Sequence, residues 1–264
     1  MALPTDGALL FGLFLAFGIV VNLASIGVWA GVERLLTSTK RIYDVPLREG
    51  QLARELLGNA LFVLIFAAGM TLVFMGGRIE TAPFSAGAAA ITFLGAMISF
   101  DLYYYALHFA MHTRALAPVH DWHHRSRVNT PWSALSMSPV EAAGWLVGLA
   151  LWPLATSSWL PFVPEAYAAW LVFFWFSNTM GHINVEIVPA SVSASPVSSL
   201  MSHAITYHAL HHSRYQKHYC FFLNSLDTLF GQVWDDYPEM HAKVASGHPL
   251  TRLGERGESA TPRA

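Results

Sequence analysis

The chain has 264 residues, of which 54% are apolar and only 12% are charged. Soluble domains carry about 25% charged residues, so this composition favours a membrane protein. The formal net charge of −2 gives no sign of a nucleic-acid-binding surface. The single cysteine, Cys220, excludes an internal disulfide, an iron–sulfur cluster and a thiolate zinc cage. Any metal ion must therefore be bound through nitrogen and oxygen atoms.

Five apolar runs follow one another along the chain. Three are long enough for the roughly 30 Å hydrocarbon layer of a bilayer: Ala8 to Ala30, Leu57 to Met75 and Ala86 to about His108. The first run has no basic residues before it, so we expect a retained helix and not a cleaved signal peptide. The fourth run, Ala142 to Leu160, ends in the turn signals Pro153 and Pro161, and the fifth, Ala166 to Met180, is short for a full crossing. These two either cross or form a hairpin that dips into the membrane.

The positions of the basic residues predict an orientation. With the N-terminus outside and five segments, Arg78 is the one residue among the fifteen Lys and Arg that lies in an outer turn. The other fourteen, and all thirteen histidines, then lie on the cytoplasmic side, as the positive-inside rule requires. We expect a multi-pass membrane protein, in a bacterial inner membrane. The chain divides into N-terminal transmembrane helices with a basic loop (1–85), a histidine-bearing domain (86–240) and a polar tail (241–264), which we expect to be mobile after Gly247.

Eight of the thirteen histidines stand in helical spacing, in three groups, and a ninth, His182, follows the fifth apolar run. Positions i, i+3 and i+4 share one face of a helix, so each group can direct its imidazoles to one region. The nine candidate metal ligands are His108, His112, His120, His123, His124, His182, His208, His211 and His212.

Neutral imidazole suits zinc, copper, iron and nickel, and nine ligands are too many for one tetrahedral zinc. They suit two metal ions with four or five nitrogens each, and iron is the choice that can activate dioxygen. Asp101, two turns before His108, is expected to accept a hydrogen bond from a ligand imidazole. His203 and His218 would either add a ligand or form only a hydrogen bond. The predicted fold is an all-α polytopic bundle of four to five membrane segments with a cytoplasmic-side histidine cap that holds two metal ions.

These motifs resemble those of the fatty acid hydroxylase and sterol desaturase superfamily of membrane di-iron enzymes. The HxxxH box and the two HxxHH boxes of that superfamily match eight of the nine histidines. The ninth, His182, matches its lone histidine before x-Asn. Further matches are Asp101, Tyr104 and Tyr105 before the first box, and Asp227, Phe230 and Gly231 near the end. The resemblance covers residues 86–233.

The chain departs from the superfamily pattern at four places. Phe109 replaces the usual Arg, and Ser138 replaces the His of His-Pro-x-Glu, which ends here in Glu141. His218-Tyr219-Cys220 stands for Asn-Tyr-Gly, and Gln232 replaces the Thr after Phe-Gly. No boxed histidine is lost, but the subfamily and its substrate stay open.

The resemblance and the metal chemistry together imply an enzyme that uses dioxygen and two iron ions to hydroxylate or desaturate a lipid, either a fatty acyl chain or a sterol-like molecule. No Gly-rich dinucleotide motif is found. The electrons are therefore expected from an external donor such as a ferredoxin, a cytochrome b5-type protein or a reductase. Basic residues near the boxes either dock an acidic donor or are ordinary positive-inside residues: Arg114, Arg125, Arg127, Arg214 and Lys217.

Two other classes of protein remain as alternatives. A non-redox membrane zinc enzyme would need fewer ligands and a general base, and the chain has no HExxH motif. A membrane protein that binds haem or transports metal would place histidines or other polar residues near the middle of the spans, whereas these lie at the ends.

Overall fold

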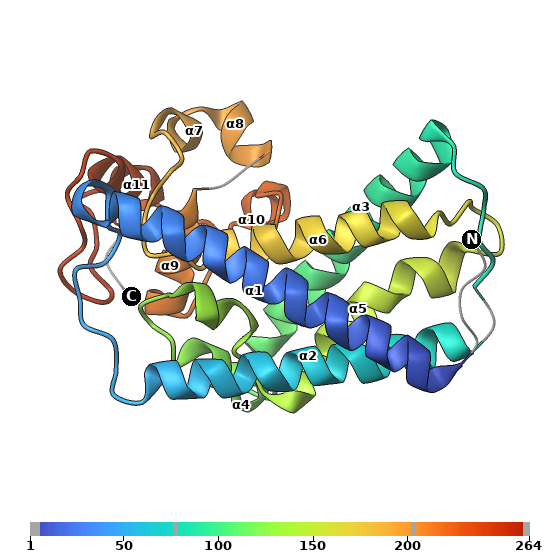
Figure 1. Ribbon diagram of the computed structural model, residues 1–264. Coiled ribbons are helices and arrows are strands. Elements are labelled where there is room, and N and C mark those ends of the chain that lie inside the picture. The colour runs from blue at the N-terminus through green and yellow to red at the C-terminus, as the bar shows by residue number, and fades with distance from the viewer. Residues whose placement is uncertain (1–5, 77–78, 202–203, 261–264) are drawn as a thin grey trace.

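Figure 1 shows the computed structural model, which describes residues 6–76, 79–201 and 204–260. Arg78 and His203 lie outside these ranges. Within them the chain is helical, and its paired extended backbone consists of two isolated bridges, Arg41 to Val185 and Tyr43 to Leu250. The long helices are α1 (Gly7–Lys40), α2 (Gln51–Met75), α3 (Ala86–Met111), α5 (Pro139–Thr156) and α6 (Pro164–Gly181). The short ones are α4 (Ala117–His124), the 3₁₀ helix η1 (Pro131–Leu135), α7 (Ser191–Ala194), α8 (Pro196–Met201), α9 (Ile205–Arg214), α10 (Ser225–Leu229) and α11 (Tyr237–Ala245).

The five long helices pack in a closed order. Helix α1 contacts α2, α2 contacts α5, α5 contacts α3, α3 contacts α6, and α6 contacts α1. Aromatic side chains fill the interior, where the rings of Phe66 and Trp175 lie 4.8 Å apart and those of Phe100 and Phe174 lie 4.9 Å apart. Large buried aromatic rings contribute much of the packing energy of such an interior.

Three helices of the described chain, α1, α2 and α3, are long and apolar enough to cross a membrane. Their outward faces carry exposed leucine and isoleucine side chains, which suits contact with lipid. Helices α5 and α6 have 18 residues each, or about 27 Å at 1.5 Å per residue. Whether these two also cross stays a prediction.

Hydrogen bonds at the helix starts agree with the local sequence. The side chain of Asp6 accepts a hydrogen bond from the Leu9 N–H at the start of α1, and Ser85 and Ser138 cap α3 and α5 in the same way. Such caps satisfy backbone N–H groups that have no partner inside the helix. Helix α1 extends ten residues beyond its apolar run, because the drop in hydropathy marks where a span leaves the lipid and not where its helix ends.

Residues 241–250, at the start of the predicted polar tail, pack against the rest of the fold. His241 and Val244 of α11 are fully buried, and so is Leu250. The backbone of Leu250 exchanges hydrogen bonds with Ile42 and Asp44. A few apolar residues among many polar ones are enough to bury this segment, which an average over composition does not reveal. The domain boundary at residues 85 and 86 stays a prediction.

Candidate metal centre

The nine candidate histidines come from four separate parts of the fold and meet at one end of the helix bundle. The end of α3 supplies two, α4 supplies three, the residue after α6 supplies one, and α9 supplies three. Each of the nine is 8% exposed or less. Segments separated by up to about one hundred residues therefore converge on one buried site.

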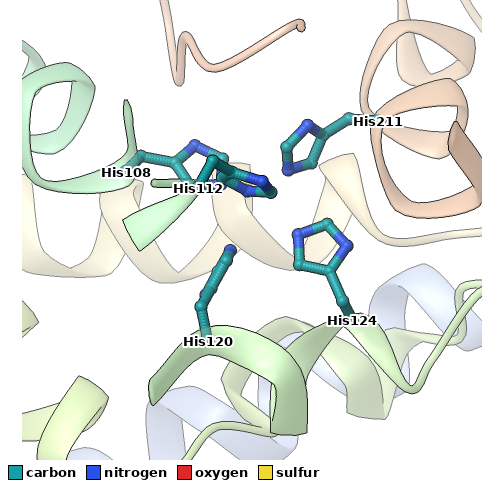
Figure 2. A group of neighbouring side chains, drawn as sticks. All are labelled: His108, His112, His120, His124 and His211. Atoms are coloured by element: carbon teal, nitrogen blue, oxygen red, sulfur yellow. The ribbon is translucent and has the colours of Figure 1, made fainter. Parts of the chain in front are cut away.

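The nine imidazoles form two groups, and within each group the ring nitrogens lie within 4.8 Å of one another. The first group contains His108, His112, His120, His124 and His211, and Figure 2 shows their rings turned toward a common space. The second contains His123, His182, His208 and His212. Metal–nitrogen bonds of about 2.1 Å keep donors within about 4.2 Å of one another, so small shifts would let each group enclose one ion.

Helices α4 and α9 each contribute to both groups. In α4, His120 and His124 belong to the first group, whereas His123 belongs to the second. In α9 the arrangement is reversed, because the i, i+4 pair joins the second group and His211 joins the first. Neighbouring helical residues point about 100° apart, so each His-His pair serves two adjacent positions. The two groups are in contact through the rings of His124 and His212, 4.8 Å apart.

Six of the nine imidazoles are oriented by a hydrogen bond from Nδ1. The acceptor is a backbone carbonyl in five cases, and for His120 it is the Glu141 carboxylate at 2.7 Å. The five carbonyl acceptors are Tyr219 for His108, Ser136 for His123, Asn178 for His182, Lys217 for His211 and Ser126 for His212, at 2.7–3.2 Å. Because these partners only accept, Nδ1 carries the proton and Nε2 presents its lone pair.

The Nε2 atoms directed inward lack ordinary partners. In the first group, all five Nε2 atoms are buried without a hydrogen bond to any described residue. In the second group, the Nε2 atoms of His123 and His182, both acceptors, face each other at 3.4 Å. Buried acceptors are rarely left unpaired, and a cation between them would satisfy both sets. The residues present therefore fit two bound metal ions.

Burial keeps these rings in the neutral form that binds metals. Loss of solvation lowers the pKa of His123 to about 4 and that of His182 to about 3. The same cause holds the pKa values of the remaining histidines of α4 and α9 well below the ordinary value. No proton has to be removed from such a ring before it binds a metal ion.

Glu141 is a carboxylate that contacts one of the nine candidate ligands, because it accepts the hydrogen bond of His120. Asp101 Oδ1 accepts a hydrogen bond from the Phe222 backbone N–H at 2.9 Å. Glu141 is 1% exposed and also accepts a hydrogen bond from the Trp145 indole at 3.2 Å. In the sequence, Glu141 is marked only by the motif Ser138-Pro139-Val140-Glu141. The separation of this motif from His120 along the chain gives no reason to expect a contact between Glu141 and His120.

The remaining histidines have structural roles among the described residues. His218, left open by its sequence position, uses both ring nitrogens: Nδ1 donates to the Tyr207 carbonyl, and Nε2 accepts from the Trp234 N–H. His241 hydrogen bonds to Ser193 and to the Val188 carbonyl. His203 lies outside the described residues. Tyr104, which matches the superfamily pattern before the first box, is buried against Trp145 with ring centres 4.5 Å apart.

Within the described residues, three hollows reach the histidines, and the smallest, of about 20 Å³, lies beside His120, His123 and His182. An apolar cavity of about 330 Å³ lies between α3, α6, α9 and residues 220–223, and His182 and His208 form part of its wall. Its volume lies in the lower part of the range for ligand sites, about 300–1,000 Å³. A cleft of about 150 Å³ reaches His124 and His212 and is lined by four arginines. These are Arg48, Arg125, Arg127 and Arg214.

Comparison with curated proteins finds several plant relatives. The very-long-chain aldehyde decarbonylase CER1 of Arabidopsis thaliana is 26% identical over 255 residues, covering 88% of this chain and 37% of its own length. The very-long-chain aldehyde decarbonylase GL1-1 of Oryza sativa subsp. japonica is 27% identical over 241 residues, covering 89% and 38%. Protein CER1-like 2 of Arabidopsis thaliana is 29% identical over 217 residues, covering 77% and 34%.

The chain thus spans little more than a third of the length of these relatives. Because they are plant proteins, they give no support to the predicted bacterial inner membrane. No solved structure matches the chain.

The model of the fatty acid hydroxylase family matches residues 93–232, which include all nine candidate ligands. This match covers more than half of the chain. The chain therefore belongs to the fatty acid hydroxylase family. Through this family it belongs to the fatty acid hydroxylase and sterol desaturase superfamily.

Proposed function

We propose that the chain is an integral-membrane oxidoreductase in which two iron ions and dioxygen hydroxylate or desaturate a lipid. The observation that carries this proposal is the pair of histidine groups beside an apolar cavity: the Nε2 atoms of the first group are buried without a hydrogen bond to any described residue, and those of the second group face one another. Two adjacent nitrogen-rich positions suit a two-metal redox centre better than a single tetrahedral zinc.

The nine histidines would hold the two ions, one in each group. Iron in these positions would supply dioxygen activation and the removal of hydrogen from an unactivated C–H bond, with electrons from outside the chain. The protein itself orients the imidazoles through the Nδ1 hydrogen bonds and keeps water away through burial. Ring orientation fixed in this way commonly changes metal affinity or activity by about 10–100-fold.

The apolar cavity would hold the lipid. Met97, Phe173 and Ile205 give it an apolar wall, and His182 and His208 stand where that wall meets the candidate metal centre. An acyl chain or a sterol-like ring system in this cavity would gain affinity by leaving water, and its reacting carbon would lie next to the second histidine group. Polar atoms of the site are few, as expected for such a substrate.

The arginine-lined cleft is the proposed docking site for the electron donor, either a ferredoxin, a cytochrome b5-type protein or a reductase. The cleft reaches one histidine of each group, His124 and His212. Arg125 pairs with Asp121 and Arg214 pairs with Asp236, whereas Arg48 and Arg127 form no ion pair with any described residue. An exposed positive rim attracts an acidic partner and accelerates its association. On the basis of charge placement, we assign this side to the cytoplasm.

A second reaction is favoured by the names of the relatives. Two of them are very-long-chain aldehyde decarbonylases, which points to a long-chain aldehyde as substrate. The apolar cavity also suits this substrate, because the aldehyde end would approach His182 and His208 while the chain stays in apolar surroundings.

Metal analysis and lipid analysis test the proposal together. Protein purified in detergent should contain two irons per chain and consume oxygen when a donor and lipid are supplied. Lipids from cells with and without the chain, compared by mass spectrometry, should show a gain of one oxygen or a loss of two hydrogens. Loss of a long-chain aldehyde with gain of a hydrocarbon would instead select the second reaction.

Matched variants make the test specific. His123→Ala should lower the iron content and abolish the lipid change, whereas His248→Ala, at an exposed position away from the centre, should do neither. One zinc per chain without oxygen uptake would replace the proposal with a non-redox metal enzyme. A Soret absorption band would replace it with a haem protein.

A further inference from the structure

Helix α10 presents an apolar surface outside the helix bundle. Leu229 is 73% exposed and the following Phe230 is 59% exposed. The other exposed positions of this short stretch, Ser225 and Thr228, carry no charge, and its one carboxylate, Asp227, is fully buried. Asp227 accepts hydrogen bonds from the Tyr207 hydroxyl and the Cys220 N–H, so it does not make this surface polar.

This surface continues the lipid-facing side of α3. The ring of Phe230 stacks on that of Tyr105, with ring centres 5.8 Å apart and planes 19° from parallel. On the same helix, Leu102 and Phe109 are exposed apolar side chains of a candidate membrane span. An apolar patch next to a helix that faces lipid is suited to contact with lipid as well.

The residues just before α10 form part of the cavity wall. Phe221, Phe222 and Leu223 line the cavity. Phe222 stacks on Phe173 of α6 with ring centres 5.3 Å apart, and its backbone N–H donates to Asp101 of α3. One continuous segment, residues 221–230, thus joins the cavity wall to the exposed surface of α10.

We propose that α10 dips into the boundary between headgroups and acyl chains beside α3, so that Leu229 and Phe230 contact lipid. The segment of residues 221–230 then forms the membrane-side edge of the cavity, and a lipid can enter from the bilayer without crossing water. The partner is the lipid surface itself, because the exposed face is uncharged and adjoins a span.

Spin labels in lipid nanodiscs test this placement without using enzyme activity. A label is attached at Leu229→Cys in a Cys220→Ala background, and its relaxation is measured with oxygen, which concentrates in lipid, and with a water-soluble nickel chelate. Leu102→Cys on α3 is the lipid-facing control, and Ser246→Cys, exposed beyond α11, is the water-facing control.

The label at position 229 should respond as the one at position 102 does, with strong oxygen enhancement and weak nickel enhancement. A response like that of position 246 would place α10 in water and overturn the proposal. Low accessibility to both reagents would also overturn it, because a protein partner would then cover the surface. A label at Phe230→Cys gives an independent reading if the first variant is poorly folded. Since neither metal content nor turnover enters the measurement, failure of the proposed function leaves it unaffected.

Discussion

At the scale of single residues, the two members of each His-His pair belong to different groups of the candidate metal centre. His123 and His124 are neighbours in α4, yet their imidazoles belong to different groups. The second group has four imidazoles and the first has five, so equal substitutions remove different shares of the ligands.

His123→Ala and His124→Ala should therefore lower the metal content of the protein by different amounts. His123→Ala leaves three imidazoles in the second group, and this variant should retain about one metal ion per chain. His124→Ala leaves four in the first group and should retain nearly two, because four nitrogens still complete a usual coordination shell. Elemental analysis of the purified variants measures the ratio. The division into two groups would be wrong if both variants lost the same amount.

Glu141 provides a second residue-scale prediction. Glu141→Leu removes the acceptor for His120 Nδ1 and leaves that donor buried, so metal affinity should fall by about 10–100-fold. Glu141→Gln keeps an acceptor oxygen of similar shape and should lose much less. Competition with a chelator, followed by metal content, compares the two. Equal losses in Leu and Gln variants would show that charge, and not the hydrogen bond, is what His120 requires.

At the scale of elements, η1 and the residues after it connect the helix bundle to the centre. Helix η1 packs against α1, α2 and α6, and the side chains of Asn59 and Asn178 donate hydrogen bonds to its carbonyls. The next residue, Ser136, accepts the hydrogen bond from His123 Nδ1. The N-terminal helices thereby help to set the orientation of a histidine that lies about sixty residues further along the chain.

The close contact at Gly58 tests this connection. A Cβ at this position of α2 would lie 2.7 Å from Ser136 Cα, and a backbone atom cannot turn away as a side chain can. Gly58→Ala should lower the free energy of unfolding by about 1–3 kcal/mol and reduce metal retention. Gly27→Ala in α1, with nothing within 4 Å, is the matched control and should be neutral or slightly stabilising. Thermal unfolding in detergent measures the stability of both variants. Equal melting temperatures would contradict the prediction.

At the scale of the whole molecule, the candidate metal centre lies between an apolar cavity and a basic cleft. The two hollows touch different histidines, so lipid and donor need not compete for one surface. In the proposed function, such a division would let the buried centre receive electrons from the aqueous side while the substrate stays in apolar surroundings.

Charge reversal at the rim of the cleft tests the docking side. Arg127→Glu should slow reduction by an acidic donor, about tenfold or more at low ionic strength, and added salt should shrink the difference. Arg252→Glu, exposed near the end of the described chain, should leave the rate nearly unchanged. Stopped-flow reduction of the metal-loaded protein measures both. A slower rate in the Arg252 variant alone would place the donor elsewhere.

The sequence by itself predicted the helical class, the five long helices and the nine histidines that meet in the structure. Each rests on a local signal: apolar runs of membrane length, and histidines at i, i+3 and i+4 along a helix. The link to the fatty acid hydroxylase and sterol desaturase superfamily followed from the same spacings, and the family match confirms it.

Tertiary structure alone decided how the histidines divide into two groups, that Glu141 accepts the hydrogen bond of His120, and that residues 241–250 are packed. These features depend on contacts between segments far apart in the chain. Spacing along a helix fixes which directions its side chains share, but the packing of other helices determines what lies in those directions.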